Sequence, residues 1–430
     1  MTTKLQAIAF KARTHPRHRF QNLTGLLDRN LLYQSWGQLN KQAAPGIDGI
    51  TSDDYEQNLP VHIHQLAHDL RTQKYRADAI QRVFIPKANG KQRPLGLPTV
   101  KDKVAQQAVS NILQSIWEQD FLPNSYGYRP NKSAHQAVHS LATNLQFQGY
   151  GYIVEADIKG FFDNMNHDWL VRMLEQRIDD KALIGLIKQW LKARIRSPEG
   201  EFTNPTAGTP QGGVISPVLA NIYLHYALDL WFEKKLKPTL KGKAMLIRYA
   251  DDFVIATQYR GDARRVYGDI PVRLKKFGLQ VAPEKTSLQR FSRFHPGRER
   301  HFVFLGFEFY WGKDAKGKPH LKRRTARKKL KKTLKAYNVW IKQNRFRKLG
   351  DLMPVIRRKL IGFQNYFGLP DNSWSLGKLQ FHVIKRLHYW LNRRGGRKRS
   401  YNWQAMNDLL IHFKIPRLKV SKRAVMVDWY

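Results

Sequence analysis

The amino-acid sequence predicts an α+β fold with more than one domain. Strand-like and helix-like stretches are mixed along the chain, without the regular strand–helix–strand alternation that a doubly wound parallel sheet requires. The last third, by contrast, carries three long helical patterns. With 430 residues, 42% of them hydrophobic, the chain is long enough for roughly two or three domains with buried cores.

Residues 1–80 are expected to form a basic N-terminal extension followed by helices. "LLDRNLLYQSWGQL" has apolar residues at helical spacing, and "APGIDGIT" then interrupts the helix with Pro45, Gly46 and Gly49. The first twenty residues contain no acid and no apolar core of a secretory signal. They are interpreted as a basic arm, and import into an organelle is disfavoured.

Residues 81–312 are expected to form the second unit. "QRVFIPKANGKQRPLGLP" predicts two short strands around the turn Asn89-Gly90, and a helix is expected from Lys101 to Glu118. "GYIVEADI" predicts a strand at 151–158, and "HDWLVRMLEQRI" a helix. "KAMLIRYADDFVIAT" predicts a strand, a tight turn and a second strand.

Residues 313–430 differ in charge, with 32 Lys and Arg against five Asp and no Glu. We expect a helical domain at 313–395 and a short basic segment at 396–430; "NRRGGRKRS" (392–400), which spans the start of this segment, is a candidate for binding DNA. Pro354 is expected in the first turn of the second helix. The apolar stripes of the three helices are Leu330, Leu334, Tyr337 and Ile341; Leu352, Ile356, Leu360, Phe363 and Phe367; and Leu376, Leu379, Val383, Leu387 and Trp390.

The net charge of +42 indicates a polyanionic partner, and nucleic acid is favoured over membrane. No run of about 18 apolar residues is present, so no membrane partner is expected. The absence of cysteine excludes disulfides and cysteine-ligated zinc. On charge alone, a ribosomal-type packing protein remains an alternative.

Asp251 and Asp252 stand side by side within an otherwise apolar stretch. Such a pair is often simple turn chemistry, but the acids of an ordinary turn would be solvated, whereas apolar strands flank this pair on both sides. Asp157 ends another apolar strand. If Asp157 and Asp251 come together, their carboxylates offer the hard oxygen ligands that Mg²⁺ prefers.

A series of ordered stretches resembles the blocks of bacterial group II intron-encoded reverse transcriptase/maturases. "VEADIKGFFDNMNHDWL", "GTPQGGVISPVLANIYLHYALD" and "RYADDFVIAT" are similar to the palm motifs of reverse transcriptases. "APGIDGIT", "IPKANGKQRPLGLPTVKDKVAQQAV" and "FLPNSYGYRPNKSAHQAV" resemble the preceding fingers blocks. "APEKTSL" and "FLGFEF" resemble the end of the palm, and "RRKLIGFQNYFGLPDNSWSL" and "HYWLNRR" resemble the thumb or maturase region. A lone YxDD would be a weak signal, whereas this ordered series is specific.

The resemblance implies a right-hand polymerase of fingers, palm and thumb with a two-metal site. Asp157, Asp251 and Asp252 would be its catalytic carboxylates. Asp157 and Asp251 would ligate two Mg²⁺ ions, or Mn²⁺, with help from the backbone carbonyl of Ile158. Asp252 would complete the acidic turn and ligate less directly, or only shape the turn.

The resemblance also implies residues that bind the incoming nucleotide and the primer. Lys87 and Arg93 would clamp the triphosphate, and Lys285 would lie near the leaving pyrophosphate; a plain surface cation is the alternative for each. Either Phe161 or Phe162 would exclude a ribose 2′-hydroxyl, the other being structural. Gln211 would contact the nucleotide, and the turn of Leu305 and Gly306 would support the primer end.

The expected activity is primer-dependent, RNA-directed DNA synthesis for a group II intron, together with splicing assistance. Its partners would be dNTPs, an RNA template with a DNA primer, structured intron RNA and target DNA, in a ribonucleoprotein of the bacterial cytoplasm. No HNH endonuclease pattern is present, so the primer is expected from a replication fork or another nick. The oligomeric state stays open. The alternatives are a reverse transcriptase recruited to phage defence or CRISPR spacer acquisition, a maturase acting mainly as an RNA-binding module, and an RNA replicase.

Overall fold

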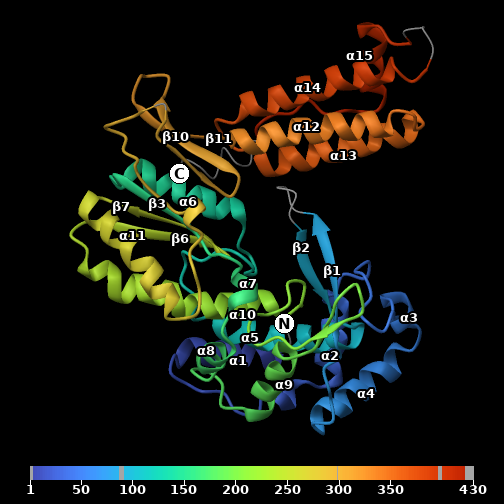
Figure 1. The fold of residues 1–430 in the computed structure, drawn as a ribbon, viewed down its shortest axis with the longest axis vertical. Helices are drawn as coiled ribbons and strands as arrows, with labels where there is room; N and C mark the ends of the chain where they lie inside the picture. The colour runs from blue at the N-terminus through green and yellow to red at the C-terminus, as the bar shows by residue number, and fades with distance from the viewer. Residues whose placement is uncertain (1–2, 87–91, 298, 396–399, 422–430) are drawn as a thin grey trace.

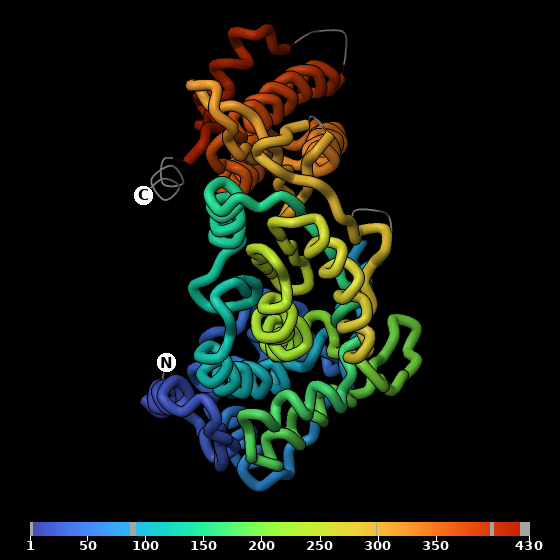
Figure 2. The backbone as a smooth tube through the Cα atoms, turned by 90° about the vertical axis from the view of Figure 1, so that its left-hand side faces the viewer, coloured from blue at the N-terminus to red at the C-terminus, as the bar shows by residue number. Residues whose placement is uncertain are grey.

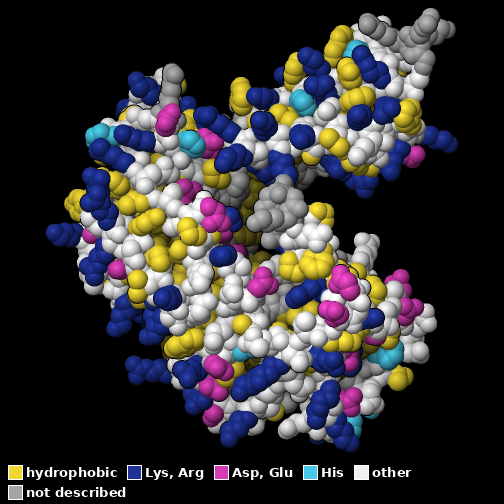
Figure 3. Space-filling view, viewed as in Figure 1, with side chains coloured by type: hydrophobic (Ala, Val, Ile, Leu, Met, Phe, Trp, Pro, Cys, Tyr) yellow, Lys and Arg dark blue, Asp and Glu magenta, His cyan; other side chains and the backbone are white. Residues whose placement is uncertain are grey.

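The computed structural model describes residues 3–86, 92–297, 299–395 and 400–421, and it confirms the predicted mixture of helices and strands. Figure 1 shows two halves: a lower half with most of the N-terminal helices, and an upper half with a helical bundle. In the turned view of Figure 2 the bundle again lies at one end of the molecule. Figure 3 shows open space between the bundle and the part that carries α2–α4.

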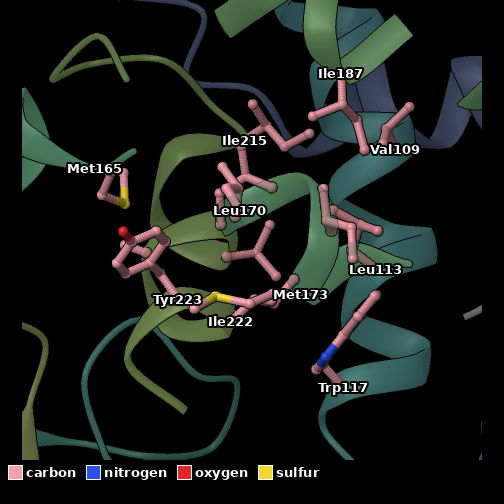
Figure 4. Packing of buried hydrophobic residues seen from close by; sticks show 14 of the residues in the cluster. Val109, Leu113, Trp117, Met165, Leu170, Met173, Ile187, Ile215, Ile222 and Tyr223 are labelled. Atoms are coloured by element: carbon pink, nitrogen blue, oxygen red, sulfur yellow. The ribbon is translucent and has the colours of Figure 1, made fainter. Parts of the chain in front are cut away.

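The N-terminal half is built mainly from helices around α5 (Val100–Trp117), which is buried along most of its length. This helix matches the expectation for Lys101–Glu118. The helices that pack around it are α1 (Thr3–Thr14), α2 (Arg29–Gln38), α4 (Leu59–Arg71), α8 (His167–Leu174), α9 (Lys181–Leu191) and α10 (Ser216–Leu224), and the short helix α3 (Ser52–Gln57) contacts α4. Figure 4 shows Val109, Leu113 and Trp117 of α5 facing apolar side chains that include Leu170, Ile187 and Ile222.

A four-stranded antiparallel sheet with the order β6-β7-β3-β8 forms the centre of the molecule. Its strands are β3 (Tyr152–Asp157), β6 (Ala244–Tyr249), β7 (Asp252–Thr257) and β8 (Ser287–Arg290). The sequence predicted β3 and the β6–β7 hairpin, and the structure confirms them. Helices α6 (Ala134–Phe147) and α11 (Arg260–Lys275) pack against this sheet.

The expected hairpin of residues 81–98 is confirmed as β1 (Ile80–Pro86) paired antiparallel with β2 (Gln92–Leu97). Its predicted turn at Asn89-Gly90 lies outside the described residues. Short strands β4 (Ile195–Arg196) and β5 (Phe202–Thr203) extend this sheet from β1.

The third sheet has the order β11-β10-β9 and leads into the helical bundle. Residues 314–318 connect strands β10 (Phe307–Lys313) and β11 (Pro319–Thr325). The segment expected to be helical from residue 313 therefore begins with a strand, and its first helix starts only at Arg327. These strands follow β9 (His301–Phe304) and precede α12 (Arg327–Asn344), α13 (Leu349–Phe367), α14 (Ser373–Leu391) and α15 (Trp403–His412).

The three predicted apolar stripes are confirmed in α12, α13 and α14, which share one core with the third sheet. The expectation for Pro354 is wrong: α13 begins at Leu349, so the proline lies beyond the first turn. The helix continues through it because its apolar face, including Leu352, Ile356 and Leu360, is fully buried. No helix among the described residues is long and apolar enough to cross a membrane.

Candidate active site

Three aspartates meet at one end of the central sheet. The register of β3 and β7 places Asp157 directly opposite Asp252, and Asp251 lies in the connection that precedes β7. That connection contains only Ala250 and Asp251, because Tyr249 pairs with Asp252. Ala250 adopts a φ of 57°, a left-handed conformation that costs a non-glycine residue about 1 kcal/mol or more. The surrounding structure must therefore hold this turn in place.

Hydrogen bonds from the buried side chain of Arg248 stabilise the turn. Its guanidinium donates to both carboxylate oxygens of Asp229, at 2.8 and 2.5 Å, and both side chains are fully buried. It also donates to the backbone carbonyl of Ala250 at 3.0 Å and to Oδ1 of Asn221 at 3.1 Å. The sequence analysis missed this group, although a charged residue at an apolar strand position was a signal for it.

Glycine at position 127 allows the loop that follows Ser125 to approach the acidic turn closely. A Cβ on Gly127 would lie 2.2 Å from the backbone nitrogen of Ala250. The carbonyl of Gly127 accepts a hydrogen bond from Asn221 at 2.8 Å. The turn is thus enclosed by Gly127 on one side and by Arg248 and Asn221 on the other.

The carboxylates disfavour each other's ionisation. Burial raises the pKa of Asp252 to about 7, and the charges of Asp157, Asp251 and Glu155 add to this. A hydrogen bond from the backbone N–H of Leu305 acts in the opposite direction and lowers this pKa. Burial also raises the pKa of Asp251, and Asp157 adds to this, whereas Lys285 and Arg93 oppose it. A site that concentrates negative charge in this way favours a bound cation.

Lys285 is the cation nearest Asp157 among the described residues. Its Nζ forms an ion pair with Oδ2 of Asp157, and this hydrogen bond raises the pKa of the lysine. Lys285 ends a short 3₁₀ turn, Pro283–Lys285, that follows the pairing of Ile158 with Val281. The contact between Lys285 and Asp157 therefore has a direct geometric basis, whereas the position of Lys285 near a leaving pyrophosphate stays a prediction.

A cavity of about 940 Å³ opens beside Asp157 and Asp252. Glu155, two residues before Asp157 on β3, lines it as well, and its carboxylate accepts hydrogen bonds from the side chain of Ser287 and from the backbone of Val303. The sequence analysis missed Glu155, although residues two apart on a strand share a face. Arg327, Lys328 and Lys329 of α12 supply positive charge to the same cavity.

A second cavity, of about 420 Å³, contains Phe162 and Gln211. The loop carrying Gln211 is fixed against β2, since the N–H of Gly96 donates to the carbonyl of Gln211 at 2.7 Å. Gly212 has a φ of 113°, and a Cβ there would lie 2.6 Å from the carbonyl oxygen of Gly96. Glycine is required at this position both by conformation and by space.

The structure distinguishes the two adjacent phenylalanines. Phe161 is buried in the core, with its ring 6.3 Å from that of Tyr223. Phe162 is partly exposed and faces Tyr128 at a ring distance of 6.3 Å. Tyr128, close enough to Asp251 to be affected by its charge, was not singled out by the sequence analysis.

The turn of Leu305 and Gly306 connects β9 to β10, with φ values of 51° and 80°. Tyr366 of α13 donates to the carbonyl of Leu305 at 2.9 Å, and the Leu305 N–H bonds Asp252. The turn therefore links the acidic residues to the helical bundle.

Arg93 and Ile158 are the remaining predicted residues that the structure describes. Arg93 is an exposed residue of β2 whose charge acts on Asp251, whereas Lys87 lies outside the described residues. Ile158 lies opposite Val281. The hydrogen bonds that join the two segments run from the N–H of Lys159 to the carbonyl of Gln280 and from the N–H of Ala282 to the carbonyl of Asp157. The carbonyl of Ile158 takes part in neither bond.

The donor set suits a hard divalent cation. Among the described residues, no three His, Asp or Glu side chains are gathered into a ready-made metal site. That result does not conflict with Mg²⁺, which is usually bound by one or two carboxylates with water and substrate phosphates. The carboxylates of Asp157 and Asp251, with the carbonyl of Ile158, provide oxygens of that kind.

Comparisons with known proteins place this geometry in context. Residues 85–309 match the family model described as "Reverse transcriptase (RNA-dependent DNA polymerase)". The chain is 34% identical to Protein YkfC of Escherichia coli over 249 residues, which are 56% of this chain and 64% of that protein. It is 29% identical to Group II intron-encoded protein LtrA of Lactococcus lactis over 341 residues, covering 66% and 55% of the two chains. Each match spans less than two thirds of the relative.

Proposed function

The chain belongs to the reverse transcriptase (RNA-dependent DNA polymerase) family, and from this premise we propose that it copies RNA into DNA from a 3′-hydroxyl primer. The observation that carries the proposal is the meeting of Asp157, Asp251 and Asp252 within the matched region. In the proposed right-hand architecture, the central sheet is the palm, the β1–β2 hairpin belongs to the fingers, and α12–α14 form the thumb.

Asp157 and Asp251 would hold Mg²⁺, or Mn²⁺, assisted by the carbonyl of Ile158. When bound, such ions lower the pKa of a primer hydroxyl and stabilise the charge of a leaving pyrophosphate. Asp252 accepts a hydrogen bond from Leu305, so its proposed role is to tie the acidic turn to the primer-supporting turn, with less direct ligation.

The nucleotide would bind between the two cavities. Arg93, with Lys87, would hold the triphosphate, and Gln211 would meet the base pair. Phe162 is the better candidate of the pair for contacting the sugar, because Phe161 is buried. Lys285 would hold a proton near the leaving pyrophosphate at Nζ, the atom that contacts Asp157.

The template–primer duplex would leave the site along α12 and α13. Lys329 lines both the cavity beside Asp157 and a groove of about 490 Å³ between these two helices. Lys332 and Lys359 add charge to the groove, and Trp340, Phe363 and Phe367 add apolar surface. Such a surface can bind a nucleic-acid duplex through its phosphates and its shape, without reading the base sequence.

We further propose that the chain serves a group II intron and binds its RNA as a splicing maturase, with target DNA as a later partner. The similarity to LtrA and the charge of residues 313–430 support this. The proposed location is the bacterial cytoplasm, in a ribonucleoprotein. Primer extension on an RNA template with dNTPs tests the polymerase, and excision of the cognate intron with and without the protein tests the maturase.

A further inference from the structure

We propose that the outer face of α14 binds unpaired RNA nucleotides at a site separate from the polymerase cleft. The surface, named the α14 stripe, consists of alternating aromatic and basic residues: Trp374, Lys378, Phe381, Lys385, Tyr389 and Arg393. The choice of RNA as the partner rests on the proposed function, whereas the arrangement of rings and cations on α14 is independent of it.

The α14 stripe lies opposite the buried face of the helix. Residues of the stripe recur every three or four positions, as do the core residues Leu376, Leu379, Val383 and Leu387 on the other side. Trp374 and Phe381 are 65% and 67% exposed, and Tyr389 is 38% exposed. The rings therefore contribute little to the core.

Each ring of the stripe has a cation beside it. Lys378 Nζ lies 4.6 Å from the ring centre of Trp374, and Lys385 Nζ lies 5.8 Å from that of Phe381. The guanidinium of Arg393 lies 3.7 Å from the ring centre of Tyr389. A basic helix face interleaved with rings matches single-stranded nucleic acid, whose bases stack while its phosphates meet the cations.

The spacing along the helix suits a strand with several nucleotides. At 1.5 Å per residue, Trp374 and Phe381 are about 10 Å apart, and Phe381 and Tyr389 about 12 Å. A cation lies between successive rings. Paired bases keep their faces within the duplex, so rings that stack on bases select unpaired nucleotides.

Charge identifies the class of partner. Helix α14 contains no Asp or Glu, and residues 313–430 carry 32 basic side chains. The three exposed rings share one face of the helix, and each has a cation beside it. An acidic or neutral protein partner would not need flat rings spaced for bases.

The stripe is remote from the path proposed for the template–primer duplex. Figure 1 shows α12 and α13 between α14 and the β1–β2 hairpin, and the groove of that path lies between α12 and α13. Figure 3 shows basic and hydrophobic side chains interspersed over the bundle. An RNA segment on α14 would therefore bind together with a duplex in the cleft.

The test uses the full chain with its cleft filled by excess template–primer ending in a dideoxynucleotide. Binding of a labelled single-stranded RNA and of an RNA duplex of equal length is measured by anisotropy. The triple variant Trp374→Ala, Phe381→Ala, Tyr389→Ala should lose about tenfold or more in single-strand affinity, with duplex affinity nearly unchanged. Phe10→Ala is the matched control, because Phe10 is also exposed and has Arg13 beside its ring.

A second variant, Lys378→Gln with Lys385→Gln, should lower the salt slope of single-strand binding by about 1.4. The rate of primer extension should be unchanged in both variants. Loss of primer extension in Asp251→Ala tests the proposed polymerase activity and does not bear on the α14 stripe. An unchanged single-strand affinity in the triple variant would overturn the proposal. So would an equal loss of duplex affinity, a change of oligomeric state, or a loss confined to binding of anionic lipid vesicles.

Discussion

Arg248 and Asp229 form a bidentate ion pair in which neither side chain is exposed. The pair joins β6, immediately before the acidic turn, to the helical segment that follows α10. Through the bond from Arg248 to the carbonyl of Ala250, it also fixes the turn that carries Asp251. A charge pair without access to water is retained only when its geometry and its additional hydrogen bonds are good.

Asp229→Asn should destabilise the protein strongly, because it leaves the guanidinium of Arg248 buried without its counter-charge. We expect the free energy of unfolding to fall by about 3 kcal/mol or more. Urea titration measures this, with Glu233→Gln as the control, since Glu233 forms a more exposed pair with Lys237 that should contribute less than about 1 kcal/mol. An equal decrease in the free energy of unfolding in Asp229→Asn and Glu233→Gln would contradict a positioning role for the buried pair.

Lys285→Gln should raise the affinity for Mg²⁺ and lower the rate of nucleotide addition. Removing the ammonium group frees the Asp157 carboxylate, so Mg²⁺ affinity should rise several-fold in calorimetry. The rate of nucleotide addition should nevertheless fall, by about 10²-fold if the lysine protonates the leaving group. Lys276→Gln, on an exposed lysine away from the acids, should change neither quantity. Weaker Mg²⁺ binding in Lys285→Gln would show that the ion pair does not compete with the metal.

Mg²⁺ binding should strengthen as the pH rises from 6 to 8. The pKa of Asp252 is raised to about 7, so its neutral form predominates below that pH, and above it the carboxylate adds a negative charge beside Asp157 and Asp251 that favours the metal. The ionised fraction goes from about one tenth to about nine tenths, which predicts about a tenfold gain in apparent affinity. Calorimetry at both pH values checks this. Asp252→Asn should flatten the dependence, and an unaltered pH slope in that variant would assign the titration to another group.

Gly212→Ala should disturb the nucleotide site specifically. Its φ of 113° and the nearby Gly96 carbonyl leave no room for a Cβ, so the loop carrying Gln211 must shift. We expect the KM for dNTPs to rise and kcat/KM to fall by about tenfold or more. The matched control is Gly185→Ala on α9, where nothing lies within 4 Å of the added Cβ. That variant should keep its activity and gain up to about 1 kcal/mol in stability.

Local pattern was enough to predict much of this fold. The β6–β7 hairpin follows from apolar stretches on either side of Asp251 and Asp252, and the stripes of α12–α14 follow from residue spacing alone. These features depend on neighbours within a few positions. The pairing of β3 with β7 was not predicted, since spacing does not encode which strands pair; the sequence showed only that Asp157 and Asp251 could bind a metal if they came together.

Features that depend on distant partners were not predicted. The partner of Arg248 is nineteen residues earlier, on a helical segment with no recognisable signal for it. The sequence predicted that one of Phe161 and Phe162 is structural but not which one, and the structure shows Phe161 packed against Tyr223 of another helix. Pro354 lies deeper in α13 than expected because tertiary burial of that helix outweighs the local cost of proline.

The most direct test of the central claim is primer extension on an RNA template with dNTPs and Mg²⁺. Wild type is compared with Asp157→Ala and Asp251→Ala, and with Asp168→Ala, an exposed acid of α8 remote from the turn. The account predicts full-length DNA from wild type and Asp168→Ala, and a loss of at least about 10³-fold in both other variants. No product from the wild type, or undiminished product from Asp251→Ala, would contradict it.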